Sequence, residues 1–198
     1  MSTATTWVDD HIIAGDVVLD FANTVYRRTP EPGADLFNNI EALTTWLARV
    51  NLLPATENPR GVFVDPGTAL GRARALRELF WTVFDAREGG RQIPTKALAD
   101  LLDTARRGIT DTTFDSAGAM TPLGADGVLA VLALRGILLV LDPLPRRVRA
   151  CDSCGWFFID TSRGRRRRWC SMKTCGNQNK AARFRSQRAT RSGSRVRE

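Results

Sequence analysis

All four cysteines of this 198-residue chain lie within 25 residues, as a Cys151-x2-Cys154 pair and, fifteen residues later, a Cys170-x4-Cys175 pair. A short Cys-x2-Cys loop lets two thiolates converge on one ion, and zinc in structural sites prefers four tetrahedral ligands. Four thiolates also fill the coordination sphere, so no position stays open for a catalytic water. The spacing predicts one structural Zn²⁺ ion bound by all four cysteines, although the common pattern has two residues rather than four in the second pair.

A disulfide framework and a thiol redox switch are the alternatives to zinc. The first 20 residues lack both the basic start and the uninterrupted apolar core of a signal peptide, so we expect a cytoplasmic protein. Disulfides are rare in that reducing compartment. A redox switch is the weaker alternative, because the chain has no fifth cysteine to act as a resolving partner.

The charge of the chain is divided unevenly at the proline-rich joint Asp142-Pro143-Leu144-Pro145. From residue 146 to 198 there are 16 Lys or Arg against 3 Asp or Glu, whereas the first 145 residues have 13 against 18. A general preference for arginine explains why lysine is scarce, but not why the cations gather in the last quarter. An acidic body joined to a basic C-terminal part predicts that this part binds a polyanion such as nucleic acid.

The cations of the last quarter fall into two groups. The run from Arg163 to Arg168 lies between the second and third cysteines, so metal binding at both ends would present its guanidinium groups to phosphates. Downstream, Asn177 can cap a helix with cations at three- and four-residue spacing, which can enter a major groove or lie along phosphates. The residues predicted to contact nucleic acid are Arg163, Arg165, Arg166, Arg167, Arg168, Lys173, Asn177, Gln178, Lys180, Arg183, Gln187 and Arg188.

Aromatic residues lie between the cysteine pairs. Trp156, Phe157, Phe158 and Ile159 can supply the small core that a metal module of this size needs, and Trp169 precedes the third cysteine. Stacking on a nucleic-acid base is the alternative use of Trp156 and Trp169. We expect core packing, because the module has little other apolar surface.

The first third of the chain contains one ambiguous segment and one clearer helix. Residues Gly15 to Val25 open with β-branched and apolar residues and then turn polar, which predicts a short strand entering a turn or helix. Asn38 and Glu41 form a capping box for a helix that ends before Pro54. The apolar positions of this helix are Ile40, Leu43, Trp46, Leu47 and Val50.

The middle of the chain predicts further helices. Asp65-Pro66 is an N-cap followed by proline at the first helical position, and Gly89-Gly90 ends that helix. Another helix begins at Pro94 and ends near Gly108. The inward positions expected for the two helices are Ala73, Leu76, Phe80, Val83 and Phe84, then Leu98, Leu101, Leu102 and Ala105.

A polar loop from Thr110 to Thr121 separates these helices from an apolar run, Leu123 to Leu141. The run is too short to span a bilayer and contains Arg135, so we expect a central buried helix and no membrane segment.

Residues 151–180, CDSCGWFFIDTSRGRRRRWCSMKTCGNQNK, closely resemble the CGNR zinc finger. The stretch Gly15 to Val25 and the helix with Trp46-Leu47 resemble the ABATE domain, which precedes this finger in bacterial proteins regarded as stress-induced transcription regulators. Gln178 stands where the finger's motif has arginine. Because the four metal positions are intact, the departure concerns a DNA contact rather than zinc binding.

The resemblance implies sequence-specific DNA binding by the finger and a sensing or partner-binding role for the helical body. Asp20, Asn23 and Thr24 match the family's polar signature and could line a ligand site. The alternative is that Asp20 and Asn23 cap the next helix or tie down a turn.

We therefore predict a mainly α fold, an α-helical bundle with a small β element at the N-terminus, plus a small C-terminal four-cysteine zinc finger. The expected divisions are an ABATE-like domain over residues 1–145, the finger over 146–192 and a disordered basic tail over 193–198, the disorder setting in from about Arg191.

The predicted function is that of a zinc-dependent, DNA-binding transcription regulator associated with the bacterial nucleoid. An RNA-binding or protein-interaction adaptor without base-specific readout is the alternative. A small-molecule effector and a homodimer are compatible with the sequence. No enzyme is expected, because the chain shows no nucleophile with a paired histidine, no phosphate-cradling glycine loop and no open metal site.

Overall fold

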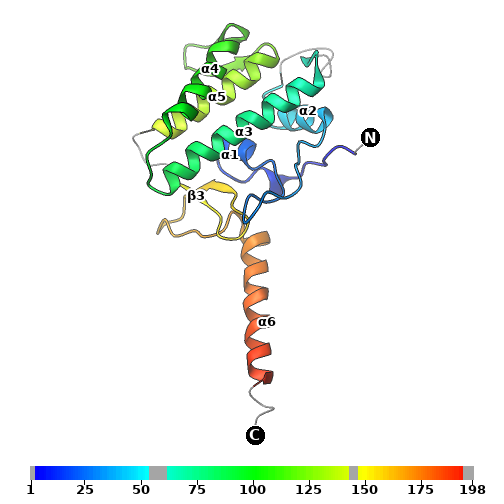
Figure 1. Ribbon diagram of the computed structural model, residues 1–198, viewed down its shortest axis with the longest axis vertical. Helices are drawn as coiled ribbons and strands as arrows, with labels where there is room; N and C mark the ends of the chain where they lie inside the picture. The colour runs from blue at the N-terminus through cyan, green and yellow to red at the C-terminus, as the bar shows by residue number, and fades with distance from the viewer. Residues whose placement is uncertain (1–2, 54–61, 143–146, 194–198) are drawn as a thin grey trace.

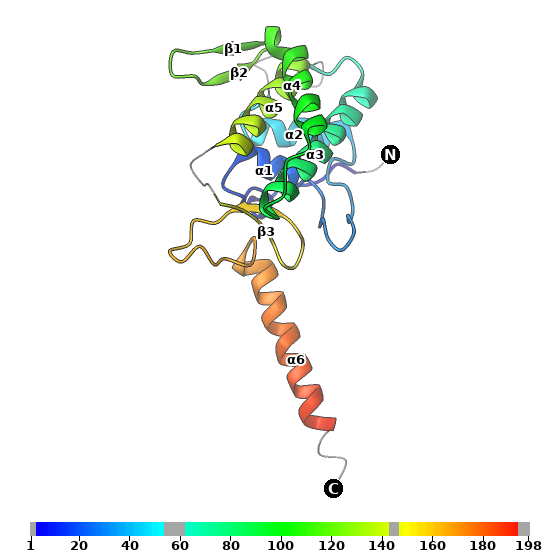
Figure 2. The same ribbon diagram turned by 60° about the vertical axis from the view of Figure 1, so that its left-hand side comes forward.

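The computed structural model describes residues 3–53, 62–142 and 147–193, and it is mostly helical, as predicted. A helical body is followed by a module around the four cysteines, and the C-terminal helix extends away from both (Figures 1 and 2). The helices are α1 (Val17–Ala22), α2 (Ile40–Arg49), α3 (Pro66–Glu88), α4 (Thr95–Gly108), α5 (Ala125–Leu141) and α6 (Asn177–Gly193). The strands are β1 (Thr112–Phe114), β2 (Met120–Pro122), β3 (Val148–Ala150) and β4 (Phe157–Ile159).

Helix α3 begins and ends where the sequence predicts. The Asp65 carboxylate accepts hydrogen bonds from the backbone N–H groups of Gly67 and Thr68, and Gly89 is the C-cap. This cap satisfies backbone donors that have no partner within the helix. All five predicted inward positions of α3 are buried, which confirms the expected face.

The N-cap residue of helix α2 is Asn39, one residue after the predicted N-cap Asn38. The side chain of Asn39 accepts from the Ala42 N–H at 2.9 Å, whereas the Asn38 amide donates to the Thr3 carbonyl. Two adjacent asparagines can both cap a helix, and the tertiary contact of Asn38 decides between them. The predicted capping box of Asn38 and Glu41 is therefore wrong. Pro54, the expected end of the segment, lies outside the described residues.

The segment Gly15 to Val25 forms helix α1 rather than beginning as a strand. The Asp16 carboxylate caps the helix by accepting from the Val18 N–H at 3.0 Å. The five residues from Val18 to Ala22 are all buried, so tertiary burial overrides the β preference of the valines. Extended pairing is limited here to a single bridge between Val25 and Asp35.

Helices α4 and α5 approach each other so closely that glycine is required at the contact. A Cβ on Gly108 would lie 2.0 Å from the Asp126 carbonyl oxygen, and one on Gly127 would lie 1.9 Å from the Asp111 carbonyl oxygen. Helix α5 is the predicted central buried helix. Leu102 of α4 is 52% exposed, so its predicted inward placement is wrong.

The expected polar loop from Thr110 to Thr121 contains an antiparallel hairpin, in which β1 pairs with β2 and Thr112 lies opposite Pro122. Short polar strands carry little alternation, which is why the pattern predicted only a loop. Within residues 3–53, 62–142 and 147–193, no helix has both the length and the hydrophobicity to cross a bilayer.

An aromatic cluster forms the centre of the body. Phe21 contacts the rings of Phe37, Trp46 and Phe80 with centroid separations of 5.5, 5.5 and 5.9 Å. Phe157 of β4 joins this core, with its ring 5.6 Å from that of Phe84. The cysteine module, residues 147–176, is therefore packed directly against the helical body.

Candidate metal centre and basic surface

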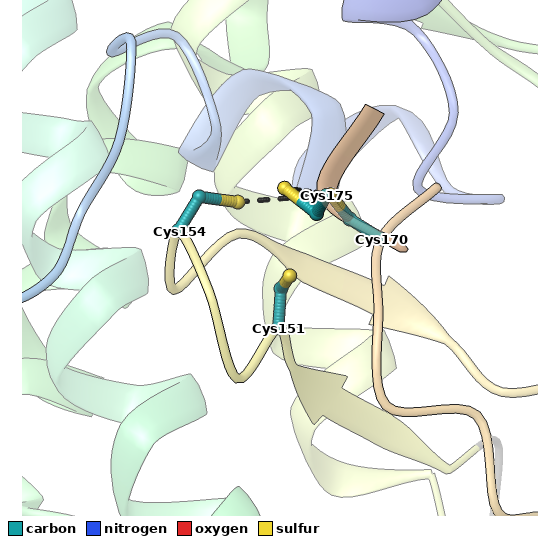
Figure 3. A group of neighbouring side chains, drawn as sticks. All are labelled: Cys151, Cys154, Cys170 and Cys175. Carbon is teal, nitrogen blue, oxygen red and sulfur yellow. Dashed lines mark hydrogen bonds between the residues drawn. The ribbon is translucent and has the colours of Figure 1, made fainter. Parts of the chain in front are cut away.

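The thiol groups of Cys151, Cys154, Cys170 and Cys175 point toward one another (Figure 3), and their sulfur atoms all lie within 4.8 Å of each other. The Sγ of Cys170 is 3.6 Å from that of Cys154 and 3.7 Å from that of Cys175, and no two are joined covalently. Zinc–sulfur bonds of about 2.3 Å in a tetrahedron place sulfur atoms about 3.8 Å apart. The spacing therefore fits one Zn²⁺ ion with a closed four-thiolate shell.

The first pair of cysteines is brought together by a tight turn after β3. The N–H of Gly155 donates to the Cys151 carbonyl, and the N–H of Cys151 donates to the Trp156 carbonyl, both at 2.9 Å. Gly155 has a φ of +74°, and a Cβ there would lie 2.8 Å from the Thr29 side chain. Glycine is thus required both by the turn and by the approach of the body.

The second pair is positioned by the π-helical turn η4 (Met172–Gly176) that precedes α6. Ser171 caps this turn by accepting from the Lys173 N–H at 3.1 Å, and the Gly176 N–H donates to the Ser171 carbonyl. Cys175 lies inside the turn, so its side chain is held by helical backbone. The cap predicted at Asn177 is therefore wrong, because the helical conformation already begins at Met172.

Hydrogen bonds among the thiols shift the pKa values of the cysteines in opposite directions. Donation from Cys154 and Cys170 holds the pKa of the Cys151 thiol far below its ordinary value. The same donation raises the pKa of Cys154 and of Cys170. A metal must therefore displace protons from the donor thiols, and its affinity falls as the pH is lowered.

The aromatic residues between the cysteine pairs are divided between two cores. Trp156 and Phe158 pack on the cysteines, and the half-buried Trp169 joins them, which favours core packing over base stacking. Phe157 and Ile159 instead contact the helical body. The prediction that all four residues after Gly155 serve the module is wrong for these two, because successive side chains of β4 point to opposite faces.

Backbone hydrogen bonds join the module to the body. The Asn23 amide accepts from the Phe157 N–H and donates to the Phe157 carbonyl, both at 2.8 Å. The indole N–H of Trp156 donates to the Val25 carbonyl at 2.8 Å. The N–H of Arg28 donates to the carbonyl of Cys154 at 2.6 Å, so the body contacts a metal ligand's own backbone.

Arg28 adds a buried ionic contact that the sequence analysis missed. Its guanidinium lies 3.8 Å from the centroid of the Phe157 ring and pairs with the Asp85 carboxylate at 2.7 Å. Burial lowers the pKa of Arg28 and raises that of Asp85. Nothing local in the sequence indicates this pair, because 57 residues separate its members.

The three residues proposed for a ligand site are buried and bonded to the protein. Asp20 Oδ1 accepts from the N–H groups of Ile13 and Ala14, both at 2.9 Å, and burial raises the pKa of Asp20 to about 6. The Thr24 hydroxyl donates to the Phe21 carbonyl. With the Asn23 contacts, this arrangement favours the alternative of tying down the chain, and a ligand role stays a prediction.

The arginine run divides into two kinds of side chain. Arg167 lies over the Phe158 ring at 4.5 Å and donates to the carbonyls of Trp169 and Cys170. Arg168 lies 4.9 Å from the Trp169 ring centroid and pairs with Asp152 at 2.6 Å. These two arginines make contacts within the module. The other three, which we call the loop arginines, are exposed: Arg163, Arg165 and Arg166.

The predicted contact residues beyond the third cysteine lie on η4 and α6. Arg188 is helical, but its side chain lies outside the described part. The expected disorder from Arg191 is wrong up to Gly193, where α6 ends, and residues 194–198 are outside the described chain. The residues with exposed side chains are Lys173, Asn177, Gln178, Lys180, Arg183 and Gln187.

Two family models match the chain. The CGNR zinc finger covers residues 147–188, which contain the four clustered cysteines. The ABATE model, described as "Putative stress-induced transcription regulator", covers residues 15–143. No curated protein matches the sequence. Because the ABATE model covers more than half of the chain, the protein belongs to the ABATE family, and it carries a CGNR zinc finger whose four clustered cysteines are placed to bind one zinc ion.

Proposed function

We propose that this chain is a zinc-dependent transcription regulator whose C-terminal finger binds duplex DNA. The observation that carries the proposal is the exposure of the loop arginines and of the α6 cations beside a closed four-cysteine centre. Arg167 and Arg168 make contacts within the module, so the loop arginines between the cysteine pairs are presented from a fixed base. Fixed cations lose less conformational entropy when they bind phosphate than cations on an unstructured chain.

The two groups of cations suit different parts of a duplex. The loop arginines suit phosphate oxygens, because guanidinium groups bind them in bidentate fashion. Helix α6 has the diameter of a major groove and carries Arg183 and Gln187 four residues apart on one face, where their side chains can bond base edges. In this proposal the loop arginines bind phosphates and so position the finger along the DNA, and helix α6 recognises the bases.

The helical body acts as an effector or dimerisation domain in this proposal. The contacts of Asn23 and Arg28 give any change in α1 or α3 a direct route to β4 and to Cys154. A groove of about 490 Å³ between α3 and α4 is where a small effector would be sought, lined by Arg72, Glu78, Thr82, Asp103, Arg107 and Leu129 among others. A homodimer would place two fingers on neighbouring half-sites.

A non-enzymatic, nucleoid-associated role follows from the same features. A closed thiolate shell offers no coordination position for a substrate or water, which supports a structural zinc ion. The family description is that of a regulator of transcription.

The second candidate is an RNA-binding adaptor. It is favoured by Gln178, which stands where the finger's motif has arginine. Arginine is the side chain that most often recognises guanine, so this chain lacks one base-specific contact at that position. Phosphate contacts by the loop arginines would then suffice for binding without base specificity.

Competition distinguishes the two candidates. The zinc-loaded chain is bound to a labelled duplex selected by genome-wide footprinting, and unlabelled selected duplex, random duplex and structured RNA are added in turn. The proposal predicts that the selected duplex competes best. Equal competition by random duplex and RNA would favour the adaptor, and duplex binding that survives complete zinc removal would contradict the proposal.

A further inference from the structure

Helix α6 has almost no protein surface to stabilise it. From Asn177 to Gln187 every side chain is exposed except that of the half-buried Asn179. The helix extends away from the body and the cysteine module in both views (Figures 1 and 2). Most helical stability in proteins comes from packing of one face, and isolated helices of this length are marginal in water.

The charges of α6 make the helix less stable still. No Asp or Glu occurs between Asp160 and Glu198, so the helix lacks the acidic partners that stabilise cations three or four residues away. Lys180 and Arg183 are instead a like-charged pair at three-residue spacing, which destabilises a helix. A polyanion laid along α6 would remove this repulsion, because it supplies the missing negative charge.

The first turn of α6, in contrast, is held by the metal centre. Cys175 is a zinc ligand inside η4, and Ser171 caps that turn. Gly176 packs so closely that a Cβ would lie 2.8 Å from the Met172 sulfur. The side-chain amide of Asn179 donates to the Cys175 carbonyl at 2.9 Å. Nucleation is the costly step of helix formation, and here the ligand geometry fixes the nucleus.

We propose that zinc nucleates α6 and that the DNA phosphates complete it, so that helix formation and duplex binding are thermodynamically coupled. This inference rests on the proposed function. It assigns zinc a share of the DNA affinity although the ion touches no nucleotide, because an ion-free module leaves α6 without its nucleus. It also requires that the helix propensity of residues facing away from DNA alters affinity.

Substitutions that change helix propensity without changing charge test the coupling. Ala182→Gly and Ser186→Ala alter α6 at exposed positions without removing a cation. If the helix forms on binding, Ala182→Gly weakens duplex affinity about fivefold and Ser186→Ala tightens it about twofold. Ala117→Gly, at an exposed position between β1 and β2, is the matched control and leaves the affinity unchanged.

Hydrogen–deuterium exchange of the zinc-loaded chain supplies a second measurement. Amides of residues 177–187 should gain protection when duplex is added, and should lose protection when zinc alone is removed from the free protein. Duplex affinity that is identical in all three variants, with no gain in protection, would overturn the inference and leave the proposed function standing. Failure of the wild type to bind any duplex at low salt would overturn both the proposed function and the duplex half of the inference. The zinc half would then be decided by whether removal of zinc lowers the protection of residues 177–187 in the free protein.

Discussion

The side-chain amide of Asn23 makes two hydrogen bonds of 2.8 Å to the backbone of Phe157, which lies 134 residues further along the chain. Both groups are buried, so neither bond can be replaced by water. An amide is the side chain suited to this contact, because it donates and accepts at neighbouring atoms.

Replacing Asn23 by alanine should therefore destabilise the protein by about 2–4 kcal/mol, since the Phe157 N–H and carbonyl would be buried without partners. Urea unfolding of the zinc-loaded chain measures the loss. Asn38→Ala, which removes the hydrogen bond of a half-buried asparagine to the Thr3 carbonyl, is the control and should cost about 1 kcal/mol or less. Equal effects of the two substitutions would show that the Asn23 contact does not hold the module.

Elemental analysis of the purified, reduced protein should find one zinc ion per chain, and Cys170→Ser should abolish stoichiometric binding. Because the module packs on the body, zinc removal should also lower the unfolding temperature of the body. Free zinc at a hundred times its dissociation constant stabilises a folded chain by about 2.7 kcal/mol. A body whose unfolding temperature is independent of zinc would contradict the coupling.

The pKa of Asp20 predicts a pH dependence of stability. Burial raises this pKa to about 6, so the stabilising difference present below the unfolded value of about 4 is lost as the pH rises through 6. Relative to Asp20→Asn, the wild type should lose about 2 kcal/mol between pH 4 and pH 7. An asparagine oxygen can still accept from Ile13 and Ala14, so the backbone contacts are kept.

Urea unfolding of both proteins across this range, with zinc in excess, gives the comparison. Protonation of the cysteines affects both proteins alike, so only the difference between the two curves reports Asp20. A difference that does not change with pH would mean that Asp20 ionises at its ordinary pKa.

Replacing the three loop arginines by alanine should weaken duplex binding by a similar factor for every DNA sequence. If each contacts one phosphate, the slope of log affinity against log salt should fall by about 3 in magnitude. Arg167→Ala should instead destabilise the module, because its contacts are with Phe158 and with backbone carbonyls. Fluorescence anisotropy across a salt series, combined with thermal unfolding, separates the two effects; an unchanged slope in the triple variant would remove the loop from the DNA interface.

Glycines inside helices provide a test of the contact between α5 and the turn Ile109–Asp111 that follows α4. Gly127→Ala should destabilise the body by about 1–3 kcal/mol or more, because its Cβ would meet the Asp111 carbonyl oxygen. Gly71→Ala in α3, where a Cβ meets nothing within 4 Å, should stabilise it by about 0.5–1 kcal/mol. Thermal unfolding of the pair compares them, and destabilisation by both would contradict the assigned packing.

Features that depend on residues close together in the sequence were predicted correctly. The Asp65-Pro66 start of α3, its apolar face and the cysteine spacing all depend on neighbours along the chain. Where two residues compete for one local role, as Asn38 and Asn39 do, tertiary contacts decide, and the prediction was wrong by one position. The strand expected after Gly15 failed because burial outweighed β propensity.

Contacts between distant segments had no such signal. The pairing of Arg28 with Asp85 joins residues far apart in sequence, and no periodicity relates them. Equally, the sequence could not show that Arg167 is used inside the module while Arg166, beside it, is exposed. That division depends on the position of the Phe158 ring, which only the folded chain defines.

The alternation of Phe157 and Phe158 along β4 limits how this finger can be moved between proteins. A fragment beginning at residue 147 would expose the Phe157 ring to water and would lose the donors to the Cys154 carbonyl. Grafting the finger onto a foreign partner would therefore require the segment from Asn23 to Thr29 to be transplanted with it. Recombination that joined only the zinc-binding stretch to another gene would yield an aggregation-prone product, so the two regions are expected to be inherited as one unit.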